Sequence, residues 1–139
     1  MRLVKMFIGL NWFKMKIKNH AMNYRMPSKD NLTGKDTSTL ELCELGIRTA
    51  TTRSFPLGKV NDIITFEGKP QKYKITSIEK LTEENTGDPE WINEWSSREQ
   101  WTPEYFKQIL GGKTVHIGSY QTSFKKIDLD LEQKTLFLD

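Results

Sequence analysis

The sequence is poor in cysteine, in histidine and in long apolar runs, and each shortage excludes a class of protein. Its single cysteine, Cys43, rules out an internal disulfide framework and a zinc site built from several thiolates. The two histidines, His20 and His116, are too far apart in sequence to indicate a metal site, so we predict neither a metal nor a cofactor. No apolar run is long enough to cross a bilayer, and polar residues interrupt the first apolar stretch. We therefore expect a cytoplasmic protein that makes no contact with a membrane.

Large apolar side chains are nevertheless plentiful. Hydrophobic residues make up 36% of the 139 positions and include four tryptophans, seven phenylalanines and four tyrosines. These side chains are sufficient to fill the core of one domain, and they argue against disorder even though 28% of the residues are charged. We predict a single folded domain over residues 1–139.

Acidic residues are nearly absent from the first 30 positions. This segment contains seven basic residues and only one acidic residue, Asp30, so its net charge is +6. Because the whole chain has a net charge of +3, the remaining residues carry a net charge of −3. Lys14, Lys16 and Lys18 alternate with apolar residues and form the polar face of a predicted strand over residues 13–18. These lysines are candidate nucleic-acid contacts. A solvated strand face or a poorly ordered extension fits the same pattern equally well.

Three positions combine a capping residue with further signals of a helix start. Two of them are followed directly by proline, and the first is followed three residues later by glutamate, the capping-box spacing. The candidate N-caps are Asp36 or Ser38 for the first helix, Asp88 for the second and Thr102 for the third. Gly46 is placed to end the first helix, whereas the acidic residues 83–88 are expected to form a solvated loop.

Apolar residues that alternate with polar ones predict six short strands. They cover residues 13–18, 63–66, 73–78, 114–121, 124–131 and 135–138. Strands outnumber helices, and regular alternation of the two is missing. We therefore predict an α+β fold, a small closed or partly closed mixed barrel with two to three short helices.

A polar cluster follows Gly46. Within residues 46–53, two arginines and three threonines occur together, and no side chain other than arginine is larger than isoleucine. Guanidinium groups present planar forks of donors, and hydroxyl groups both donate and accept, which suits a phosphate, a carboxylate or the edge of a base. Two plainer interpretations remain open: Arg53 pairs with a carboxylate of the barrel, and Thr49 and Thr52 are ordinary strand formers.

The same cluster resembles the G-x-K-T-x-T-x-R signature of the ASCH domain, a relative of the PUA barrel. The matching positions are Gly46, Arg48, Thr49, Thr51 and Arg53. Two further motifs follow in the family's order. Residues 60–66 are similar to its V-G-D strand opening, with Asn61 where the family has glycine, and residues 95–106 are similar to its acidic motif before a helix. The resemblance covers roughly residues 36–128.

The resemblance implies a PUA-like barrel with a cleft that takes RNA, a nucleotide or a modified nucleoside. One branch of the family hydrolyses the acetyl amide of N4-acetylcytidine, and some relatives are reported as ribonucleases. By motif position, the amidohydrolase roles fall on Arg48 as proton acceptor, Thr51 as nucleophile and Glu99 as proton donor. Four more residues are candidates for ligand contact: Thr49, Arg53, Trp101 and Tyr120.

Arg48 departs from the family, which has lysine at this position. A guanidinium group keeps its proton in proteins, so Arg48 cannot be a general base, although it could hold an anion or stabilise an oxyanion. Either Glu99 is the base, or the chain binds its ligand without hydrolysing an amide. A regular strand would also point Arg48 and Thr51 to opposite faces, so a shared site requires a bend between them. We predict ligand binding first, with amide hydrolysis as the alternative and RNA cleavage behind both.

Overall fold

The computed structural model describes residues 17–22 and 38–128. The strands in these ranges are β1 (Lys18–His20), β2 (Ala50–Arg53), β3 (Ile63–Phe66), β4 (Lys72–Lys80) and β5 (Tyr120–Ile127). They form one mixed sheet in the order β1-β3-β4-β5-β2, in which only the β1–β3 pair is parallel. The α+β class is confirmed. Because β1 and β2 are both edges, the five described strands form an open sheet and not a closed barrel.

Within the described residues, four helices accompany the sheet: α2 (Thr39–Glu44), α3 (Glu83–Thr86), α4 (Pro89–Arg98) and α5 (Pro103–Ile109). The side chains of all three predicted N-caps, Ser38, Asp88 and Thr102, accept hydrogen bonds from backbone N–H groups of the first turn. The loop predicted over residues 83–88 was wrong in part. Residues 83–86 form α3, because the Thr82 hydroxyl caps this helix and two glutamates occupy its first turn.

The predicted strands 114–121 and 124–131 are not two strands. A single strand, β5, includes the last two residues of the first range and residues 124–127 of the second, and it pairs with β4 on one side and β2 on the other. Before it, the Ser119 N–H donates to the His116 carbonyl, and Gly118 takes a φ of 98° that favours glycine, so the chain turns here. The predicted strand 135–138 and residues 13–16 lie outside the described residues.

The helices and strands enclose two groups of buried apolar side chains. The first packs α2 against the sheet and includes the mutually contacting rings of Phe66, Tyr73 and Phe124. The second lies among α4, α5 and the chain before β5, around Trp95 and Trp101. Each such side chain contributes about 1.5–3 kcal/mol when it leaves water.

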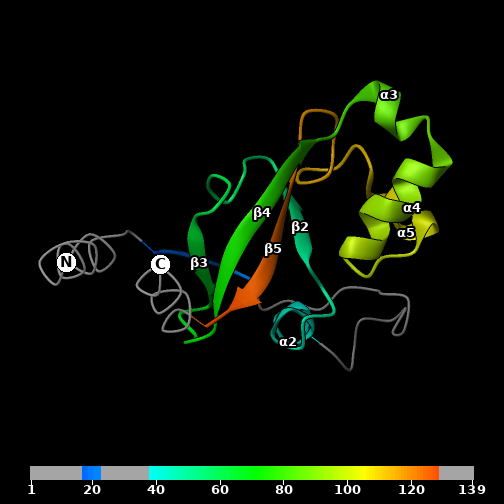
Figure 1. Cartoon of the computed structure of the whole chain (residues 1–139). Helices are drawn as coiled ribbons and strands as arrows, with labels where there is room; N and C mark the ends of the chain where they lie inside the picture. The colour runs from blue at the N-terminus through cyan, green and yellow to red at the C-terminus, as the bar shows by residue number, and fades with distance from the viewer. Residues whose placement is uncertain (1–16, 23–37, 129–139) are drawn as a thin grey trace, which may run out of the picture.

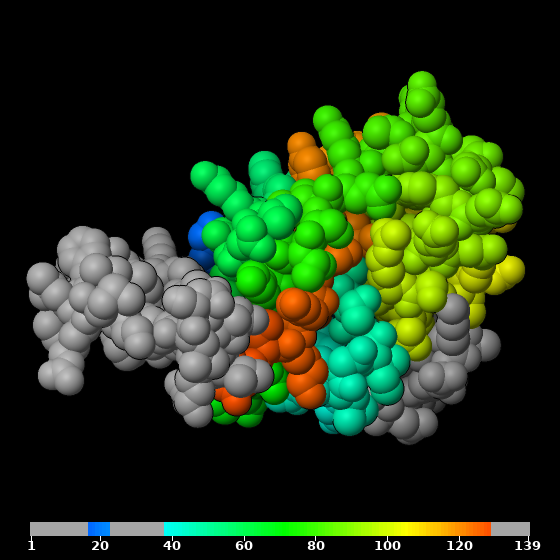
Figure 2. All heavy atoms as spheres, viewed as in Figure 1, coloured from blue at the N-terminus to red at the C-terminus, as the bar shows by residue number. Residues whose placement is uncertain are grey.

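Figure 1 shows how the elements are arranged around the β2 edge of the sheet. α3, α4 and α5 gather on that side, whereas α2 lies apart from them, close to the start of β2. In the space-filling view the residues of α3, α4 and α5 form a continuous layer beside the strands (Figure 2). Among the described helices, none has both the length and the apolar character needed to cross a membrane.

Candidate ligand-binding site

A buried ion pair joins the segment after α2 to the end of α4. Gly46 ends α2 with a φ of 76°, and the chain then places Arg48 with only 2% of its surface exposed. Its Nη2 lies 3.1 Å from Oε1 of Glu99, and its Nη1 donates to the Glu99 backbone carbonyl at 2.9 Å. One guanidinium therefore holds both the carboxylate and a terminal carbonyl of α4.

The Glu99 carboxylate receives donors from two strands as well. Oε1 accepts the Thr52 backbone N–H at 2.8 Å, and Oε2 accepts the Thr52 hydroxyl and Gln121 Nε2, the latter at 2.9 Å. Burial raises the pKa of Glu99, while Arg48 and the hydrogen bonds from Thr52 and Gln121 act in the opposite direction. The carboxylate thus connects β2, β5 and α4 at one buried point.

The structure brings together the side chains of Arg48, Thr51 and Glu99. This is possible because the regular strand covers only the second half of the motif at residues 46–53. β2 begins at Ala50, so Arg48 precedes it and is free of the strand's alternation. Arg48 Nη2 lies 3.5 Å from the hydroxyl oxygen of Thr51, which is fully buried. This is the bend that a shared site requires.

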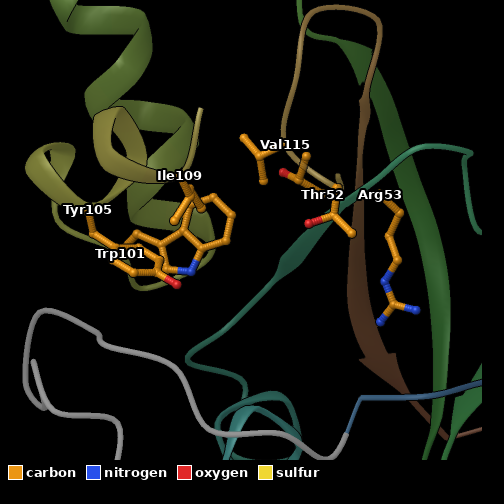
Figure 3. A pocket seen from close by; sticks show the side chains of 7 residues that line it. Thr52, Arg53, Trp101, Tyr105, Ile109 and Val115 are labelled. Carbon is orange, nitrogen blue, oxygen red and sulfur yellow. The ribbon is translucent and has the colours of Figure 1, made fainter. Parts of the chain in front are cut away.

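A cavity of about 390 Å³ opens beside this polar cluster (Figure 3). Its described lining comes from β2, the α4–α5 connection, α5 and the chain before β5. The lining residues are Thr52, Arg53, Trp101, Tyr105, Ile109, Thr114 and Val115. Figure 3 shows the Thr52 hydroxyl on the side that faces Trp101. The threonine that reaches this cavity is therefore Thr52, whereas Thr51 contacts Arg48 behind it.

Trp101 forms the aromatic wall of the cavity. Its ring packs edge-on against Tyr105 at 5.7 Å between centroids, and Arg48 Cζ lies 5.8 Å from its ring centroid. Its indole Nε1 is buried and has no hydrogen-bond partner among the described residues. A buried donor without a partner leaves a hydrogen bond unmade, which costs free energy.

Arg53 lines the cavity but uses its guanidinium elsewhere. Nη2 donates to the Ala21 carbonyl and lies 3.9 Å from Met22 Sδ, so it holds the described segment 17–22 against β2. Figure 3 shows the side chain turned away from Trp101. Its partner is a backbone carbonyl, not the carboxylate that the plainer interpretation expected.

The other predicted contacts lie outside the cavity beside Thr52 and Trp101. Thr49 lines a smaller cavity of about 130 Å³, which it shares with Arg48 and Tyr73. Tyr120 begins β5 beside Lys80, whose Nζ is 5.9 Å from the tyrosine ring centroid. Lys18 Nζ lies 3.8 Å from Asp62 on the surface. Lys14 and Lys16 fall outside the described residues.

Sequence reasoning missed Gln121 and gave Thr52 only a structural role. Thr52 and Gln121 are direct partners in the β2–β5 register, which is how both reach Glu99. Gln121 also donates to the Trp95 carbonyl at 3.0 Å and accepts from Arg98 Nη1 at 2.9 Å. Nothing local marks these residues, because only the pairing of two distant strands brings them together.

Comparisons with protein-family models, with curated proteins and with solved structures found no match for this chain.

Proposed function

We propose that the cavity beside Thr52 and Trp101 binds the base of a nucleoside, a nucleotide or single-stranded RNA. The observation that carries the proposal is a cavity of about 390 Å³ with an aromatic wall, two threonine hydroxyls and an unpaired indole N–H. Small-molecule sites have volumes of about 300–1,000 Å³ and combine apolar walls with a few polar groups. Bases present flat aromatic faces and polar edges, which suit such walls.

The proposal includes the finer fold assignment, a PUA-like barrel of the ASCH kind. Two of the matching motifs, at residues 46–53 and 95–106, meet through the contacts of Arg48 and Thr52 with Glu99. Contact between motif residues 47 to 51 positions apart favours a common site over chance similarity. The open sheet of the described strands is compatible with a barrel whose remaining strands come from other residues.

Binding to the cavity is tested with a variant that fills it. Ile109, at the end of α5, lines the cavity, and replacing it with tryptophan puts a second indole into the space. We expect Ile109→Trp to lower the affinity for nucleoside monophosphates by tenfold or more in calorimetric titrations. The matched control is Ile117→Trp, at an exposed position that does not line this cavity, and it should bind like the wild type.

A single-stranded oligonucleotide provides the RNA arm of the same experiment. Contacts between basic side chains and RNA phosphates release counterions. The affinity for RNA should therefore fall steeply as the salt concentration rises from about 50 to about 200 mM. Binding in the wild type that Ile109→Trp leaves unchanged would place the ligand elsewhere. Absence of binding to every nucleotide and RNA tested would contradict the proposal.

A second candidate is hydrolysis of an acylated nucleoside, and the hydrogen bond from the cavity-lining Thr52 hydroxyl to Glu99 favours it. Because the guanidinium retains its proton, the base role would fall to Glu99, and Arg48 would stabilise the developing oxyanion. Incubation with N4-acetylcytidine, followed by chromatography of the deacetylated product, tests this candidate. Arg48→Lys restores the family's lysine and should raise turnover. No product from either protein would exclude it.

A further inference from the structure

The Thr52 hydroxyl has one lone pair left for a ligand. A hydroxyl group can donate one hydrogen bond and accept two. Here it donates to Oε2 of Glu99 and accepts the indole N–H of Trp95 at 3.0 Å. The remaining site on the oxygen is an acceptor, and the side chain lines the cavity.

The directions of these bonds follow from the neighbours. An indole nitrogen only donates, and an ionised carboxylate only accepts. Arg48 stays charged and lies against Glu99, so the carboxylate is the form that neutralises it. The Thr52 proton is therefore committed to Glu99, and the cavity receives an acceptor at this point.

Trp101 supplies the opposite group. Its Nε1–H is a donor with no partner among the described residues, and it belongs to the wall of the same cavity. A buried donor left unpaired costs free energy, which an acceptor atom on a ligand would recover. The cavity therefore carries one acceptor on β2 and one donor on the connection between α4 and α5.

We infer that the cavity selects a planar base through a ring or exocyclic N–H directed at Thr52 and an acceptor atom directed at Trp101. The inference rests on the proposed function and adds its specificity. Uracil, cytosine and adenine each carry an N–H beside an acceptor atom, so all three fit this pattern. What should decide binding is whether the base still carries the N–H that donates to Thr52. Methylation that removes this N–H should weaken binding and leave the ring and the sugar unchanged.

Matched nucleosides test the inference on the unmodified protein. The pairs are uridine with 3-methyluridine, cytidine with N4,N4-dimethylcytidine, and adenosine with N6,N6-dimethyladenosine. One hydrogen bond corresponds to about a tenfold change in affinity at the upper end of its usual contribution. We expect the parent nucleoside of at least one pair to bind about tenfold more tightly than its methylated partner in calorimetric titrations.

Two variants separate hydrogen bonding from the size of the methyl group. Thr52→Ser keeps the hydroxyl and should keep the preference, whereas Thr52→Val keeps the shape and should lose it. A preference that survives in Thr52→Val would overturn the inference, because the methyl group would then be excluded on size alone. Equal binding of all matched partners would also overturn it and leave the proposed function standing. Failure of every nucleoside, nucleotide and RNA oligonucleotide to bind would overturn the proposed function, and the inference with it.

Discussion

Replacing Glu99 with alanine should destabilise the protein severely, because the change leaves Arg48 as an unpaired buried cation. The structure gives the scale: both side chains are at most 2% exposed, and the carboxylate accepts four hydrogen bonds from Arg48, Thr52 and Gln121. Breaking a buried ion pair by removing one partner costs about 3–5 kcal/mol. A domain of this size has about 5–15 kcal/mol of total stability, so a large share would be lost.

Urea denaturation followed by tryptophan fluorescence measures this cost. The matched control is Glu94→Ala, which removes an exposed glutamate of the same helix that pairs with Arg98 at 3.7 Å and should cost about 0.5 kcal/mol or less. A double-mutant cycle then measures the coupling between the two side chains. The double variant Arg48→Met/Glu99→Leu should lose at least about 1 kcal/mol less unfolding free energy than the single variants Arg48→Met and Glu99→Leu lose together, which is within the usual range of coupling energies. The reasoning would be refuted if Glu99→Ala lowered the free energy of unfolding by less than about 1 kcal/mol. It would also be refuted if the losses of the two single variants added up to the loss of the double variant.

Three smaller predictions follow from individual residues. Burial raises the pKa of Cys43 to about 12, so this thiol should not react with thiol reagents at pH 8 in the folded protein and should react fully in urea. Prompt reaction without denaturant would contradict this expectation. Burial lowers the pKa of His20, so the folded state binds a proton less readily than the unfolded one. Stability should therefore fall as the pH drops through the ordinary histidine value of 6.5, and NMR titration of the ring should show the lowered pKa. Gly46→Ala should cost about 1 kcal/mol in urea titrations because φ is 76°, whereas Gly87→Ala, at a φ of −86°, should cost less; equal losses would remove the backbone argument.

The features that could be predicted from the sequence are those decided by residues close together in the chain. Ser38, Asp88 and Thr102 cap helices through bonds to N–H groups two or three residues away, so their patterns identified all three starts. Asn61 takes a left-handed φ of 77°, a conformation that asparagine tolerates better than most residues.

The features that could not be predicted depend on pairing across long distances. The sequence predicts two strands where β5 lies, because it does not reveal that β4 pairs along the whole of β5 and β2 along its first four residues. The β2–β5 register sets Thr52 opposite Gln121, and no local pattern showed that both would reach Glu99. The motif located Arg48 and Glu99, whereas the identity of the cavity-facing threonine required the fold.

The indole N–H signals of the tryptophans offer the most direct test of the claim that the cavity beside Thr52 and Trp101 binds a base. In a ¹⁵N-edited NMR titration with a nucleoside monophosphate, the account predicts that the Trp101 signal moves downfield as its free donor gains an acceptor. The Trp91 signal should stay in place, because that indole already donates to Glu79 at 3.0 Å and does not line the cavity. Saturating ligand that leaves Trp101 unchanged, or that moves Trp91 instead, would contradict the account.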